Sequence, residues 1–186
     1  MRIFSTTEAS KFVGSDDLAS FFDDVRWQYA DPLPAYFLPK DSGVKVALSR
    51  FLANTFLGRS PVFLWFTEWG ICESCEHLDL FDRYRLSYGE KRKVSEAPVH
   101  FVEAIAELDA LISLVCMGLF FAWGFEMMDQ NRSIAVTVSH DQWIEYRFAP
   151  GHENLSPYLA VHLKEFCDTR VAGAKWRRTS LGEAQP

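Results

Sequence analysis

The chain has 186 residues, of which 48% are hydrophobic, 15% aromatic and 24% charged. This composition is typical of one globular domain and excludes a disordered, collagen-like or coiled-coil chain. The 19 Lys and Arg residues against 25 Asp and Glu residues give a net charge of -6, which argues against a nucleic-acid partner. We expect a single globular domain over residues 1–168 and a polar, flexible tail over residues 169–186.

The N-terminal residues 1–8 lack the apolar stretch of a secretory signal. The four cysteines are too few and too scattered for a disulfide framework; they are Cys72, Cys75, Cys116 and Cys167. We therefore expect a cytoplasmic protein with reduced thiols. The uncharged residues 110–125 would form a helix about 24 Å long, shorter than the ~30 Å hydrocarbon core of a bilayer. We expect them to form a buried helix and not a membrane span, with Cys116 as a small core residue.

The first part of the chain is predicted to form two helices and a strand. A helix begins after Ser15, which can cap it, and ends before Pro32. A second helix opens at Asp41 or Ser42 and stops near Gly58. The apolar, aromatic run over residues 61–67 then predicts a central strand.

A third helix is predicted over residues 74–88. The strongest helical pattern follows over residues 101–121, where apolar side chains recur at steps of four and three. Because the second half of this segment is apolar all round, we expect a long central helix buried on every side. Ile105 belongs to its predicted apolar stripe.

The remaining segments predict a meander and a last helix. Residues 125–129, 134–139 and 143–148 are short apolar runs separated by turns, which indicates antiparallel strands. A helix follows over residues 156–167. Helices and strands do not alternate regularly, so the predicted fold is α+β, with an antiparallel or mixed sheet of about four to five strands packed against several helices.

A Cys-x-x-Cys pair follows the predicted central strand. The segment resembles the active-site region of thioredoxin, because a strand is followed by Trp69 and then by Cys72 and Cys75 at the start of a helix. This resemblance implies a thiol–disulfide oxidoreductase. The chain departs from that pattern because Glu73 and Ser74 stand between the cysteines and Trp69 does not adjoin Cys72. The carboxylates of this segment also disfavour the thiolate.

The same segment offers a zinc alternative. Cys72, Cys75 and His77 are ligand types that suit zinc. A fourth ligand could come from elsewhere in the chain: His100, His152, His162 or Cys167. A structural zinc signature normally has a second closely spaced pair, and none is present, so we expect no cofactor and keep zinc as the alternative.

Acidic residues are concentrated in two stretches without a base, residues 68–82 and residues 94–131. An acidic face can steer a basic partner, and tryptophans at the ends of elements suit an interface. The candidate binding residues combine these features: Trp69, Glu73, Glu103, Glu107 and Trp143.

No catalytic motif is present, and Ser139-His140-Asp141 is interpreted as a turn, not as a triad, because triads are assembled by the fold. We therefore assign no catalytic residue. The sequence favours a non-catalytic protein-binding module, of an immunity-protein, antitoxin-like or accessory kind, whose partner has a basic surface. The alternative function is a thiol–disulfide oxidoreductase or zinc-site protein that uses Cys72 and Cys75.

Overall fold

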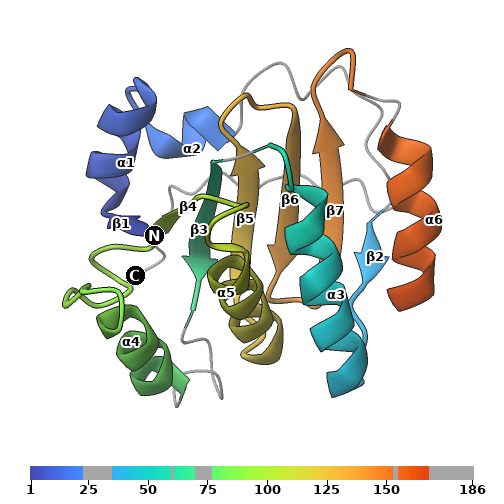
Figure 1. The fold of residues 1–186 in the computed structure, drawn as a ribbon, viewed down its shortest axis with the longest axis horizontal. Helices are drawn as coiled ribbons and strands as arrows, with labels where there is room; N and C mark the ends of the chain where they lie inside the picture. The colour runs from blue at the N-terminus through green and yellow to red at the C-terminus, as the bar shows by residue number, and fades with distance from the viewer. Residues whose placement is uncertain (23–34, 60, 70–76, 153–154, 168–186) are drawn as a thin grey trace, which may run out of the picture.

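The computed structural model describes residues 1–22, 35–59, 61–69, 77–152 and 155–167. They form one antiparallel sheet of seven strands, in the order β1-β4-β3-β5-β6-β7-β2 (Figure 1). The strands are β1 (Arg2–Phe4), β2 (Tyr36–Phe37), β3 (Val62–Glu68), β4 (Val99–Val102), β5 (Gly124–Asp129), β6 (Ile134–Ser139) and β7 (Trp143–Phe148). The helices are α1 (Thr6–Val13), α2 (Leu18–Phe22), α3 (Ser42–Thr55), α4 (Leu78–Leu86), α5 (Leu108–Phe120) and α6 (Ser156–Phe166). The α+β class is confirmed.

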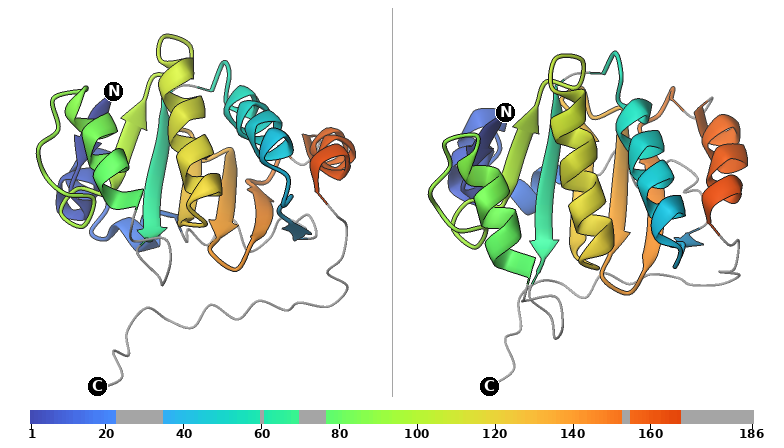
Figure 2. Two further views of the ribbon diagram at one scale, coloured as in Figure 1. Left: turned by 90° about the horizontal axis from the view of Figure 1, so that it is seen from below. Right: turned by 60° about the horizontal axis from the view of Figure 1, so that its bottom comes forward.

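Helices cover the two faces of the sheet unequally. Helices α3, α4, α5 and α6 lie over one face, and α1 and α2 lie on the other side, near β1, β4 and β3 (Figures 1 and 2). The main core lies under the four helices and includes Leu48, Phe66, Leu114 and Leu159. The second core lies under α1 and α2 and includes Ala9, Phe21, Phe63, Phe101 and Met128. The alternation of side chains along β3 therefore supplies both cores.

The prediction of four to five strands was too low. The strands predicted over residues 61–67, 125–129, 134–139 and 143–148 are present, and the antiparallel meander is confirmed. The additional strands β1, β2 and β4 have two to four residues each. Segments of that length carry too few side chains for a period-two pattern, so the sequence did not reveal them.

The predicted helix over residues 101–121 was wrong in its first half. Phe101 and Val102 belong to β4, and α5 begins only at Leu108. All four residues of β4 are buried, so the strand shows no alternation of apolar and polar residues. Ile105, placed on the apolar stripe of that helix, has 71% of its surface exposed. Helix α5 was expected to be buried on every side, which is wrong: Phe120 has 42% of its surface exposed, and Cys116, expected in the core, is only half-buried.

Most other predicted helix boundaries agree with the structure. Asp41 caps α3 by accepting a hydrogen bond from the Val44 backbone N–H, and Gly58 adopts a positive φ just beyond the helix. Helix α1 was not predicted, although Ser5 and Glu8 form a capping box there. Predicted helical residues 23–30 and 74–76, and the predicted tail over residues 169–186, lie outside the described residues. No helix in the described ranges is long and apolar enough to cross a membrane.

A buried arginine ties α4 to the segment that leads into β4. The Arg85 side chain is fully buried and donates to the carbonyl oxygen of Ala97 at 2.5 Å and to that of Arg92 at 3.1 Å. Asp82, one turn earlier, lies 3.4 Å from the same guanidinium. These bonds satisfy carbonyl groups that otherwise would be buried without partners.

We expect Arg85→Ala to lower the free energy of unfolding by about 3 kcal/mol, because it leaves buried carbonyls unpaired and opens a cavity. The matched control is Arg83→Ala on the exposed side of the same helix, expected to change stability by less than about 0.5 kcal/mol. Urea denaturation of both variants measures the difference. Equal effects would show that the buried guanidinium has no special role.

Candidate functional site

A bulge at the end of β3 directs Glu68 toward the β6–β7 turn. The pairing of β3 with β5 shifts register between Phe66 and Glu68, so that Glu68 lies opposite Gly124. A β-bulge of this kind changes the direction in which a side chain points. Gly124 leaves room for the carboxylate, because a Cβ there would lie 2.6 Å from Glu68 Oε2.

Two carboxylates converge on the imidazole of His140. Glu68 Oε2 lies 2.5 Å from Nδ1, and Asp141 Oδ1 lies 3.2 Å from Nε2. The three side chains are accessible, with exposed fractions of 43% for Glu68, 32% for His140 and 63% for Asp141. Two carboxylates face a single imidazole, so the group has a net negative charge and is open to solvent.

The Ser139-His140-Asp141 segment forms a turn, as expected. The Gln142 backbone N–H donates to the Ser139 carbonyl oxygen at 3.0 Å, and Gln142 has a φ of 64°. The Ser139 hydroxyl oxygen accepts from the Asp141 backbone N–H at 3.1 Å. It forms no hydrogen bond with the His140 ring in the described part of the chain, so the three residues are not aligned as a nucleophilic triad.

Aromatic side chains lie at the same end of the sheet. Trp69 follows Glu68 and is half-buried against the main core. Helix α5 ends beside the start of β5, which leaves Phe120 with 42% of its surface exposed. The next residue, Phe121, stacks on the ring of His77 with centroids 4.4 Å apart. We call Glu68, Trp69, Phe120, His140 and Asp141 the sheet-end site.

The structure brings together only part of the predicted binding residues. Trp69 belongs to the sheet-end site, and Trp143 lies at the same end of the sheet with only 8% of its surface exposed. Trp143 therefore has little surface with which to contact a partner. Glu73 lies outside the described residues.

Glu103 and Glu107 lie at the opposite end of β3. Glu103 follows Val102, which pairs with Val62 at the start of that strand, and a strand of this length places them roughly 20 Å from Glu68. One Glu107 carboxylate oxygen contacts the N-terminal amino group, and the other accepts from the Glu103 backbone N–H at 3.0 Å. Glu107 is thereby occupied by contacts within the chain, whereas Glu103 is exposed.

The structure describes only some of the residues of the thiol or zinc alternative. Cys72 and Cys75 lie outside the described residues, so that alternative stays a prediction. His77 packs its ring on Phe121. The proposed fourth ligand His100 is fully buried between aromatic rings, and burial lowers its pKa to about 3. Among the described side chains, no three His, Cys, Asp or Glu residues are arranged to bind a metal.

No binding role was predicted from the sequence for Glu68, Phe120, His140 or Asp141. The contact between Glu68 and His140 joins residues 72 positions apart. Motif spacing reports only on local neighbours, so no such signal could have joined them. A hint in the sequence was that Glu68 and Trp69 directly follow the strand predicted over residues 61–67.

We expect Gly124→Ala to uncouple Glu68 from His140 with little loss of stability, because the added methyl group displaces the flexible carboxylate. In a double-mutant cycle of Glu68→Gln and His140→Gln, the interaction free energy should be about 0.5 kcal/mol in the parent chain and near zero with Gly124→Ala. Chemical denaturation measures each corner of the cycle. An unchanged interaction energy in the Gly124→Ala background would contradict the geometry described here.

Comparisons with models of protein families, with curated proteins and with solved structures found no match. A function can therefore be argued only from the chemistry of the chain's own residues. In the sheet-end site, accessible carboxylates converge on one imidazole, and aromatic side chains lie at the same end of the sheet.

Proposed function

We propose that the chain is a non-catalytic protein-binding module that recognises a basic surface of its partner through the sheet-end site. The observation that carries the proposal is the convergence of Glu68 and Asp141 on His140 at an accessible end of the sheet. The proposal keeps the acidic and aromatic character expected from the sequence. It moves the centre of the surface from Glu103 and Glu107 to the opposite end of β3.

Electrostatics favour a cationic partner group at this position. Two carboxylates share one imidazole, so a Lys or Arg of a partner can pair with an oxygen that His140 does not use. The chain as a whole carries a net charge of -6, which attracts a basic partner over a longer range. Such complementarity raises the association rate and selects against acidic partners.

Besides complementary charge, an interface needs apolar contact surface, and this end of the sheet also offers it. The exposed part of Phe120 and the half-buried indole of Trp69 lie at the same end of the sheet as the carboxylates. Buried aromatic anchors surrounded by polar groups dominate the binding energy of many interfaces. A partner segment with a basic residue beside an apolar one fits this arrangement.

A binding role fits the described geometry better than a hydrolytic one. The carboxylate–imidazole pair could serve as a general base, but its neighbour Ser139 uses its hydroxyl oxygen to hold the turn. No other Ser, Thr or Cys among the described residues forms a hydrogen bond with His140. We therefore assign the cluster to recognition.

We expect the double variant Glu68→Lys with Asp141→Lys to slow association with the partner at least about tenfold, because it reverses the charge that steers the encounter. The matched control, Glu103→Lys with Asp109→Lys, changes the same charge at the opposite end of β3 and should alter the rate less than about twofold. Stopped-flow or biosensor kinetics with each partner found in an affinity screen give the rates. Equal effects of the two double variants, or unchanged binding in both, would contradict the proposal.

A further inference from the structure

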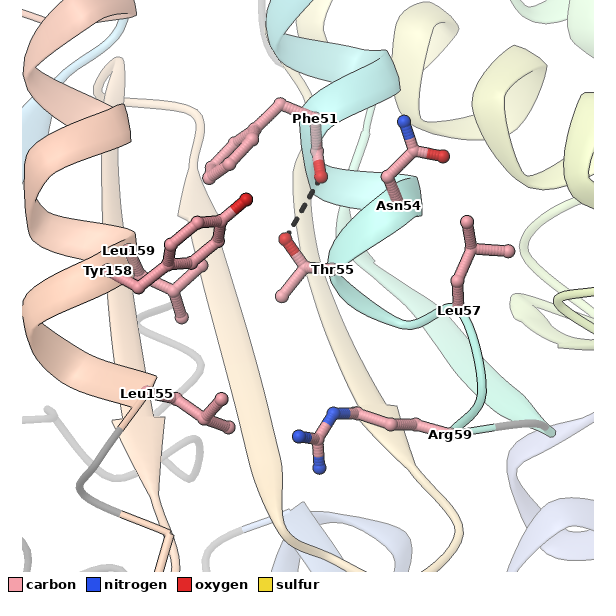
Figure 3. Close-up of a pocket in the computed structure, with 8 residues that line it drawn as sticks. All are labelled: Phe51, Asn54, Thr55, Leu57, Arg59, Leu155, Tyr158 and Leu159. Atoms are coloured by element: carbon pink, nitrogen blue, oxygen red, sulfur yellow. Dashed lines mark hydrogen bonds between the residues drawn. The ribbon is translucent and has the colours of Figure 1, made fainter.

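A pocket of about 220 Å³ lies between the C-terminal end of α3 and the N-terminal end of α6 (Figure 3). Its lining residues come from these two helices and from the segment that follows α3: Phe51, Asn54, Thr55, Leu57, Arg59, Leu155, Tyr158 and Leu159. The pocket is at the end of the molecule opposite the sheet-end site, because α3 ends near the start of β3 and the β5–β6 turn (Figure 1). An inference about it is therefore independent of the proposed function.

The described lining residues combine apolar side chains with one charged group. Phe51, Leu155 and Leu159 offer carbon surface from two sides, and Arg59 reaches toward the space between the helices in Figure 3. No lining residue within the described part of the chain is acidic. The described lining is thus cationic in a protein that has a net charge of -6.

The Arg59 guanidinium has unused donors. Its backbone N–H donates to the Phe56 carbonyl oxygen at 2.9 Å, which closes the turn after α3. In the side chain, Nη1 lies 3.4 Å from Ser133 Oγ, a long hydrogen bond, and the Ser133 hydroxyl itself donates to Asp129. No carboxylate of the described chain lies within ion-pair distance of Arg59. A guanidinium has five N–H donors, so most of them remain for a ligand.

A buried tyrosine contacts one of the residues that line the pocket. Tyr146 on β7 is fully buried in the main core, and its hydroxyl forms no hydrogen bond of ordinary geometry with a described residue. Burial raises the pKa of Tyr146, and a contact with the Thr55 hydroxyl opposes that rise. Tyr146 therefore lies beside Thr55, which lines the pocket. Thr55 donates its own hydrogen to the Phe51 carbonyl oxygen at 2.9 Å. The pocket wall is therefore polar at Thr55, between the apolar ends.

We propose that the α3–α6 pocket binds a small monocarboxylate whose carboxylate pairs with Arg59 and whose apolar body packs between Phe51, Leu155 and Leu159. A cavity of about 150 Å³ accommodates benzene, so the observed volume corresponds to a ligand of about nine heavy atoms. The planar fork of one arginine matches a carboxylate in a bidentate pair. Phosphate esters normally recruit several donors, and Arg59 is the one cationic side chain among the described lining residues.

Phenylacetate is a suitable probe, and phenylacetamide is its uncharged counterpart of the same shape. In ¹⁵N-labelled full-length protein, phenylacetate should cause saturable amide shifts at residues 51–59 and 155–159, with a Kd of about 1 mM. Phenylacetamide should bind about tenfold more weakly, because it cannot form the charge-assisted pair with Arg59. This comparison uses the unmodified chain and does not depend on a variant that folds.

Arg59→Gln should weaken phenylacetate binding about tenfold and leave the weak binding of phenylacetamide unchanged. The matched control is Arg50→Gln, an exposed arginine on α3 that does not line the pocket, and it should leave both affinities within about twofold. Equal affinity for acid and amide, an equal loss in the two variants, or shifts outside the pocket would overturn the proposal.

Discussion

Strand β3 is the element on which the rest of the structure depends, because both of its faces are covered. Phe63 enters the second core beneath α1 and α2, whereas Leu64 and Phe66 enter the main core beneath the larger helical layer. Burial of each such side chain contributes about 2 kcal/mol relative to exposure. Since β3 pairs with β4 on one side and β5 on the other, its position fixes the register of the sheet centre. Its last residue, Glu68, then enters the candidate site.

The connections around β3 explain why one face of the sheet is apolar and the other is partly polar. Helix α4 links the antiparallel neighbours β3 and β4, whereas α5 links β4 to β5 across β3, and both helices lie on the face that also carries α3 and α6 (Figure 1). On the other face, beyond the second core, Arg147 donates to Glu126 at 3.1 Å and to the Thr137 hydroxyl at 3.0 Å. Burial raises the pKa of Glu126, and the Arg147 charge opposes that rise. These contacts join β5, β6 and β7 on this face, although the cost of burying both charges offsets much of the attraction between them.

Local sequence patterns predicted the elements that have enough length to show a period. Strand β3 and the meander β5–β7 are apolar runs bounded by turns, and α3 has an Asp41 cap and a glycine beyond its end. Strand β4 was not predicted, because its four buried residues and the apolar residues after them happen to be spaced like the apolar face of a helix. The candidate site could not be predicted as a unit. Its carboxylates and imidazole come from the ends of different strands, and only the bulge in β3 and the small residue Gly124 bring Glu68 within reach of His140.

The central claim is that a basic partner binds at the end of β3 that carries Glu68, and amide shift mapping tests it most directly. The ¹⁵N-labelled chain is titrated with a short peptide that contains alternating lysine and tryptophan, at low and at moderate salt. The account predicts saturable shifts that cluster at residues 68–69, 120–124 and 139–142 and weaken as salt is raised. Shifts centred on residues 103–109, shifts spread over the whole acidic surface, or no saturable shift would contradict it.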